Sequence, residues 1–224
     1  MNKKKVLYLS LVVIMVAILS FSSLAWFTDN DSASNDFQIN GAGQDDSDEI
    51  FSVDVKEKVD GKDQPVDEMK FGEVLPGAEY KKAAYVSNTG SYNQYIRVTL
   101  TITDWNLIKD IVSINMDDNF ADNWYIDTKG VSIDANGNLV SDSTDEKLVV
   151  VLYLNNILKP DFKFDLMDSV SISEKATQGD FTNKELADGF QIDILADAVQ
   201  TENVLDSYGD VHWENAKASF EALA

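Results

Sequence analysis

The sequence predicts an all-β protein, a sandwich with a few short helices that is preceded by a signal peptide and an N-terminal arm. Three observations lead to this prediction: a basic and then apolar N-terminus, many short segments of alternating polarity, and turn residues between those segments. Many short strands with little helix are typical of a sandwich and not of a parallel α/β fold.

The first 25 residues have the three parts of a secretory signal peptide. Lys3, Lys4 and Lys5 precede an apolar run over 6–21, and small residues follow at Ser23 and Ala25. Small residues at these two positions predict signal cleavage after Ala25, which makes Trp26 the new N-terminus. The alternative is an uncleaved membrane anchor, because 6–25 is about long enough to span a bilayer.

Residues 26–43 form the predicted arm. An apolar pair at its start is followed by a polar stretch and then by the short alternating segment 37–40. Such a segment either docks on another subunit or pairs within its own sheet, and the pattern alone leaves both open. Residues 44–224 are expected to form one β-sandwich domain.

Period-two alternation predicts the strands of this domain. In 50–55, Phe51, Val53 and Val55 alternate with polar residues, as in a half-buried strand. The same reading applies to 69–74, 83–87, 95–103, 148–154, 162–167 and 191–196. Turns are predicted at 60–61, 76–77, 88–90 and 136–137. Apolar residues at helical spacing predict helices over 104–114 and 213–223.

The composition of the chain limits which macromolecules it can bind. The chain has 39 Asp+Glu against 18 Lys+Arg, a formal net charge of −21 at pH 7. Such a surface repels nucleic acid and anionic lipid, so we expect no nucleic-acid partner and membrane contact only through an uncleaved signal segment. The absence of cysteine excludes thiol catalysis, thiolate metal sites and disulfides.

The sequence lacks the motifs of common secreted hydrolases. Its single histidine, His212, and the absence of an H-E-x-x-H motif leave no zincin-type site, and no G-x-S-x-G elbow is present. We therefore expect no enzyme, no catalytic residue, no metal ligand and no cofactor. Weak structural calcium is the alternative, at the acidic clusters 45–49 and 117–122; we read a third cluster, 134–138, as a hairpin turn.

Three blocks of the sequence resemble the TasA/camelysin family of exported bacterial surface and biofilm-matrix proteins. Residues 24–29 (Leu-Ala-Trp-Phe-Thr-Asp) with 31–37 resemble the processing site of proteins cut by the signal peptidase SipW. Residues 72–77 (Gly-Glu-Val-Leu-Pro-Gly), 80–91 and 95–98 are similar to the family's central signature. Residues 196–203 are similar to its last core strand.

The resemblance implies a jelly-roll-like sandwich that is secreted to the matrix or cell surface and polymerises into fibres. Its partners would be the signal peptidase and then copies of itself or homologous matrix subunits. The arm of one subunit would complete the sheet of the next as a donor strand, with apolar anchors at Trp26, Phe27, Phe37 and Ile39. Strand addition of this kind gives an open, head-to-tail filament.

Two other roles occur within the same resemblance. One is a monomeric surface accessory or binding module, in which the arm pairs inside its own sheet. The other is a secreted metalloprotease of the camelysin type, from which this sequence departs because His212 is its only histidine.

Overall fold

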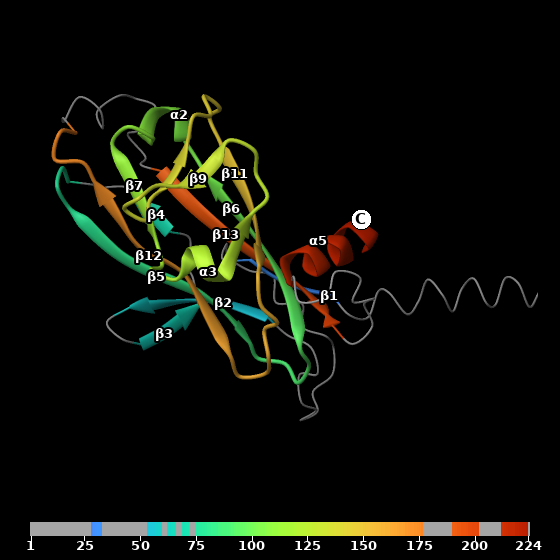
Figure 1. The fold of residues 1–224 in the computed structure, drawn as a ribbon. Helices are drawn as coiled ribbons and strands as arrows, with labels where there is room; N and C mark the ends of the chain where they lie inside the picture. The colour runs from blue at the N-terminus through green and yellow to red at the C-terminus, as the bar shows by residue number, and fades with distance from the viewer. Residues whose placement is uncertain are drawn as a thin grey trace, which may run out of the picture.

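The chain folds as two antiparallel β-sheets packed face to face, as seen in a computed structural model (Figure 1). The structure describes residues 28–32, 53–59, 62–65, 69–71, 75–176, 190–201 and 212–223. The expected all-β sandwich is confirmed.

The first sheet, called sheet A, has the strand order β1-β13-β6-β11-β8, and β4 also pairs with β13. Its strands are β1 (Thr28–Ser32), β4 (Met69–Phe71), β6 (Gln94–Ile102), β8 (Trp124–Ile126), β11 (Leu148–Leu154) and β13 (Phe190–Gln200). The two longest strands of sheet A, β6 and β13, pair without interruption from Ile102 opposite Ile192 to Gln94 opposite Gln200.

The second sheet, called sheet B, has the order β3-β2-β5-β12-β7. Its strands are β2 (Val53–Val59), β3 (Lys62–Pro65), β5 (Glu79–Asn88), β7 (Val112–Met116) and β12 (Lys163–Ile172). A separate two-stranded sheet is formed by β9 (Val131–Ile133) and β10 (Leu139–Ser141), joined by the predicted turn at Gly137, whose φ is +83°.

The core lies between sheets A and B, where several strands bury alternate side chains, most regularly Val98, Leu100 and Ile102 of β6 and Val112, Ile114 and Met116 of β7. Val98 and Leu100 of β6 face Val86 of β5 and Val170 of β12 within one contiguous cluster, and all four are 1% exposed or less. The chain passes from one sheet to the other after β1, β3, β4, β5, β6, β7, β11 and β12. This repeated crossing is the connectivity expected of a jelly-roll-like sandwich.

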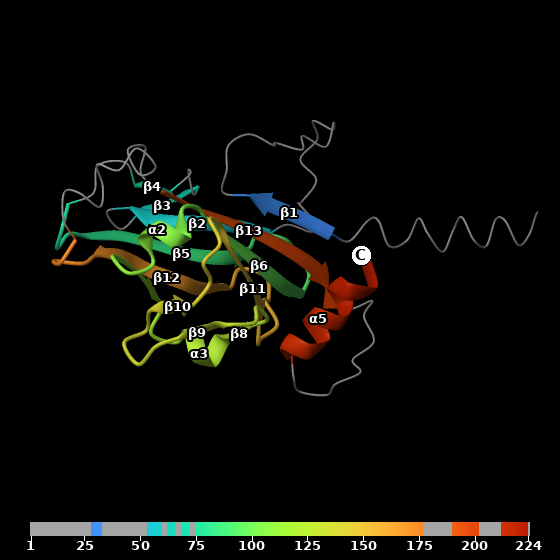
Figure 2. The same ribbon diagram turned by 90° about the horizontal axis from the view of Figure 1, so that it is seen from above.

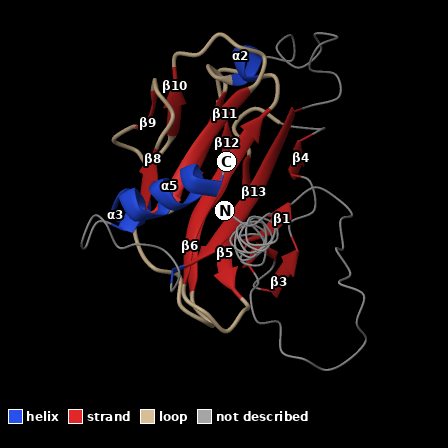
Figure 3. Cartoon of the chain, turned by 90° about the vertical axis from the view of Figure 1, so that its right-hand side faces the viewer, coloured by secondary structure: helices blue, strands red, loops and turns tan. Residues whose placement is uncertain are grey.

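Helices are few in the described part of the chain. They are α2 (Trp105–Ile108), α3 (Phe120–Asn123) and α5 (His212–Leu223). The last confirms the helix predicted over 213–223, and Figure 3 shows it crossing the outer face of sheet A.

The helix predicted over 104–114 is wrong beyond its first turn. It ends at Ile108, and Val112, Ile114 and Met116 then alternate as the buried side of β7. The β-branched residues Val112 and Ile114 favour a strand once this segment pairs with β12. The remaining predicted strands exist with shifted ends, mostly longer, and 148–154 is found with the predicted bounds.

Candidate functional site: the outer edge of strand β13

The outer edge of β13 is covered by two short segments that come from far earlier in the chain. Strand β4 pairs with Phe190 to Ile192, and β1 pairs with Leu195 to Val199 (Figure 2). No strand pairs at Asp193 or Ile194 on this side in the described residues. Sheet A is therefore completed at this edge by two separate strands, β4 and β1.

Strand β13 presents different side chains to its two faces. Ile192, Ile194, Ala196 and Ala198 belong to the core cluster, each 1% exposed or less. Its other face lies under α5 near the C-terminal end, where Val199 joins a second cluster with Tyr95, Tyr153, Ala216 and Phe220. In the acceptor segment 195–199, residues 196–199 are buried and Leu195 is half-buried, and hydrogen bonding at the edge of this segment is what β1 supplies.

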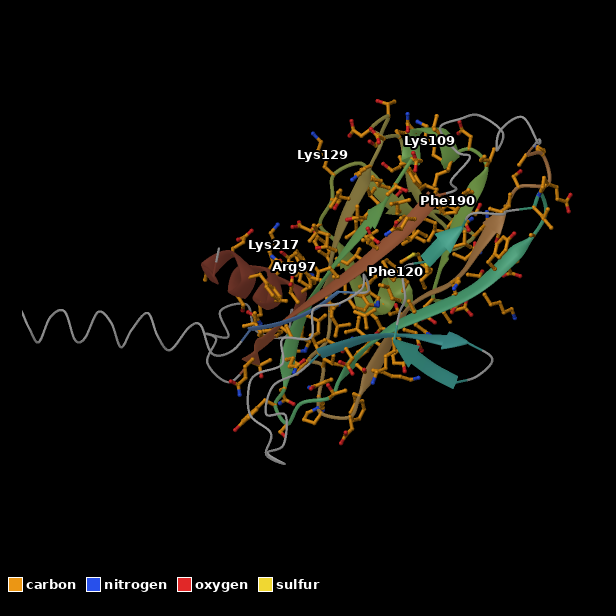
Figure 4. All side chains as sticks on the ribbon, turned by 180° about the vertical axis from the view of Figure 1, so that it is seen from behind. Arg97, Lys109, Phe120, Lys129, Phe190 and Lys217 are labelled. Carbon is orange, nitrogen blue, oxygen red and sulfur yellow. The ribbon has the colours of Figure 1, made fainter. Side chains whose placement is uncertain are left out.

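An ion pair fixes this segment from the side of α5. Arg97 of β6 lies directly opposite Asp197 of β13, and its Nε donates to Asp197 Oδ2 at 2.8 Å. The guanidinium also lies 4.5 Å from the ring centroid of Phe220 in α5. Figure 4 labels Arg97 beside Lys217 at the C-terminal helix. The Arg97 side chain therefore links β6 to both β13 and α5.

Two further contacts hold α5 on sheet A. Trp213 stacks on Tyr125 with ring centroids 3.6 Å apart and an interplanar angle of 14°. Lys217 Nζ donates to Asp127 Oδ1 at 2.8 Å, and this hydrogen bond raises the pKa of Lys217. Burial raises the pKa of the Tyr153 phenol below the helix. These contacts anchor α5 at its start and at its middle, where Tyr125 belongs to β8 and Asp127 follows that strand.

The segment that pairs with β13 belongs to the predicted arm. Residues 28–32, Thr-Asp-Asn-Asp-Ser, run antiparallel to β13, with Asn30 opposite Asp197 and Ser32 opposite Leu195. Here the arm pairs within its own chain, one of the two alternatives that the sequence pattern allows. This segment is polar throughout, so backbone hydrogen bonds are its contribution to the edge.

The other predicted arm and processing residues lie outside the described residues. These are Ser23 and Ala25 before the predicted cut, Trp26 after it, and Phe27, Phe37 and Ile39 as anchors. The signal peptide over 1–25 lies outside them as well.

His212 is the first residue of α5 and is half-buried. Among the described residues, its Nδ1 has no hydrogen-bond partner.

Two of the acidic clusters considered for calcium meet in one hollow of about 650 Å³ on the outer face of sheet B. Its acidic residues are Glu79, Asp117, Asp118, Asp134 and Asp168. Asp134 Oδ1 accepts hydrogen bonds from the backbone N–H of Asn136 and Asn138, at 2.8 and 2.9 Å. These bonds, led by the one from Asn138, lower the pKa of Asp134. Segment 134–138 is therefore the hairpin turn that was predicted.

No group of three or more histidine, cysteine, aspartate or glutamate side chains is arranged to hold a metal ion in the described ranges. The acidic cluster 45–49 is outside them. Within the same ranges, no helix is both long and apolar enough to cross a membrane.

Sequence reasoning missed the Arg97–Asp197–Phe220 arrangement. Arg97 and Asp197 are 100 residues apart, and neither stands in a pattern that marks it as paired. The only available signal was their occurrence in two of the blocks that carry the family resemblance.

The fold and the edge define a class: an all-β sandwich whose outermost long strand is completed by a segment of the N-terminal arm. No protein-family model matches this chain, and neither a curated protein nor a solved structure matches it.

Proposed function

We propose that this protein is an exported structural subunit of cell-surface or biofilm-matrix fibres of the TasA/camelysin kind. After signal cleavage, the arm of one subunit would add to β13 of the next. The observation that carries the proposal is the pairing of 28–32 with 195–199, because it identifies an edge that accepts this arm through five consecutive residue pairs.

The physical basis is strand addition to an open edge. Backbone hydrogen bonds provide affinity without requiring a particular donor chain, so an identical arm from a neighbour satisfies the same groups. Each subunit has one arm and one such edge, and a head-to-tail contact that does not close grows a filament.

The second candidate is a monomeric surface accessory or binding module of the same family. The same pairing favours this candidate, because β1 and β13 belong to one chain. The two candidates differ only in which copy provides the arm.

Cysteine cross-linking distinguishes these two candidates, because the native chain contains no cysteine. Ser32 lies opposite Leu195, and opposite residues of an antiparallel pair have Cα atoms about 4.5–5.5 Å apart, within the range of a disulfide. We would mix the mature single variants Ser32→Cys and Leu195→Cys under mild oxidation and examine the products on a non-reducing gel.

A cross-linked dimer of the two variants supports strand addition between subunits. The double variant, cross-linked within one monomer while the mixture stays uncross-linked, would replace the fibre proposal with the accessory module. A mixture of Ser32→Cys with Ser132→Cys is the control, because Ser132 is exposed in the β9–β10 hairpin and does not pair with β1. Filaments in electron micrographs should disappear when residues 26–40 are deleted.

A further inference from the structure

The tip of the β9–β10 hairpin contains an asparagine followed by a glycine, Asn136 and Gly137. In such a dipeptide, the backbone nitrogen of the glycine can attack Cγ of the asparagine side chain and form a cyclic imide. The side-chain nitrogen leaves as ammonia and takes the proton of the glycine N–H with it. Water then opens the ring to aspartate or isoaspartate. Glycine favours the attack because it has no side chain to hinder it.

The hairpin leaves this dipeptide open to the reaction. Asn136 is exposed, and so is Ala135 before it. A Cβ atom placed on Gly137 would meet nothing closer than Met116 O, at 4.0 Å. Neither burial of Asn136 nor crowding at Gly137 therefore prevents cyclisation in the described chain.

Backbone hydrogen bonds restrain the attacking nitrogen instead. The Gly137 N–H donates to Asp134 O at 3.1 Å, so the proton that has to leave is engaged in the turn. The Gly137 carbonyl oxygen accepts from the N–H of Met116 at 2.9 Å, and the Asp134 N–H donates to Asn138 O at 2.9 Å. The peptide between residues 136 and 137 is thus held on both sides. Attack requires the turn to open first.

The carboxylate of Asp134 closes the same turn from its other side. Its Oδ1 accepts from the N–H of Asn136 at 2.8 Å and from that of Asn138 at 2.9 Å. Its Oδ2 accepts from Asn138 Nδ2 at 3.1 Å. Without this side chain the two backbone N–H groups lose their acceptor, and local opening of the turn becomes more frequent.

We propose that Asn136 is a site of spontaneous deamidation and that the Asp134 turn sets the rate of this modification. The inference is independent of the proposed function. Both products add a negative charge at position 136, in the hollow that Asp117, Asp118 and Asp134 also line. Isoaspartate in addition lengthens the backbone by a methylene group between Asp134 and Asn138, which disrupts the spacing of their hydrogen bonds. The modified hairpin is therefore less stable than the original one.

Peptide mapping by mass spectrometry measures the reaction in the purified chain at neutral pH. Asn136 should lose its amide at least about tenfold faster in urea than in buffer, because the folded turn is rarely open. In buffer, Asp134→Ala should accelerate the reaction by about tenfold, as expected when one or two hydrogen bonds are lost. Asp134→Asn retains a side-chain oxygen that can accept the same N–H groups, so its rate should stay within about threefold of the wild-type rate.

Asn40 and Gly41 form a second dipeptide of this kind and serve as the internal reference. In urea the two dipeptides should react at similar rates, and in buffer the Asn40 rate should be the same in the wild type and both variants. Equal Asn136 rates in urea and in buffer would overturn the inference. So would a wild-type rate in Asp134→Ala that circular dichroism shows to be folded. The first comparison uses only the wild-type chain, so it decides the question even if that variant does not fold.

Discussion

Arg97 and Asp197 lie directly opposite each other on β6 and β13, joined by a hydrogen bond of 2.8 Å from Nε to Oδ2. The Asp197 side chain is 9% exposed and that of Arg97 is 34% exposed. The pair lies at the centre of the acceptor segment, where Asn30 of β1 pairs with Asp197 on the other side. Arg97 therefore contacts both β13, through Asp197, and α5, through Phe220.

Removing Arg97 should destabilise the protein through the carboxylate left behind. We expect Arg97→Met to lower the free energy of unfolding by about 2–3 kcal/mol, since Asp197 is nearly buried whereas the arginine is partly screened by solvent. Urea unfolding measures this change. Lys129→Met, at an exposed position, is the matched control and should change it by less than about 0.5 kcal/mol. Equal effects of the two substitutions would contradict the assignment.

The stack between Trp213 and Tyr125 should hold the start of α5 on sheet A. We expect Trp213→Ala to lower the free energy of unfolding by about 2 kcal/mol, because it removes apolar contact and a close aromatic pair. The near-ultraviolet circular dichroism signal should also fall. Trp213→Phe keeps a stacked ring and should retain more than half of the lost stability. A greater loss with phenylalanine than with alanine would count against the stack.

Gly137 should be intolerant of a side chain for backbone reasons. Its φ is +83°, and a Cβ atom there would meet nothing closer than Met116 O at 4.0 Å. Gly137→Ala should therefore cost about 1–2 kcal/mol through the left-handed conformation alone. Gly137→Asn should cost less, since asparagine tolerates this region. Thermal unfolding of the two variants measures the difference, and equal melting temperatures would refute this explanation.

Acid should loosen the β9–β10 hairpin through Asp134. Hydrogen bonds from Asn138 and Asn136 lower the pKa of Asp134 below its usual 3.8. Because the folded value is below the unfolded one, the stabilisation is present at neutral pH and is lost as the pH falls below about 4. Side-chain carboxyl chemical shifts followed by NMR should give the midpoint. A midpoint at or above 3.8 would contradict this prediction.

Much of the fold could be predicted because alternation is a local property. In β6, Val98, Leu100 and Ile102 alternate with Arg97, Thr99 and Thr101, and the turn at 136–137 carries the glycine that its φ requires. The helix prediction over 104–114 was wrong because Trp105, Ile108, Ile111 and Val112 match a helical face, while the chain from Val112 onward pairs with β12. Local pattern contains no information about that partner.

The candidate site shows the same limit. The sequence indicated an arm, but not where on the sandwich it pairs. It also gave no sign that Arg97 would meet Asp197, which lies 100 residues further along the chain. Contacts between residues so far apart in the sequence are seen only in the folded chain.

Division of the β13 edge between β4 and β1 sets the conditions under which the arm can change partner. Because β4 covers Phe190 to Ile192 separately, exchange of β1 exposes only five residue pairs and leaves the rest of the strand protected. Within one chain, the linker over 33–52 holds the arm at an effective concentration of the order of millimolar. The arm of a neighbouring subunit would have to compete with this effective concentration. If the chain is exported and assembles as proposed, the local concentration of subunits, and not affinity alone, would decide whether sheet A is completed by the arm of the same chain or by that of a neighbour.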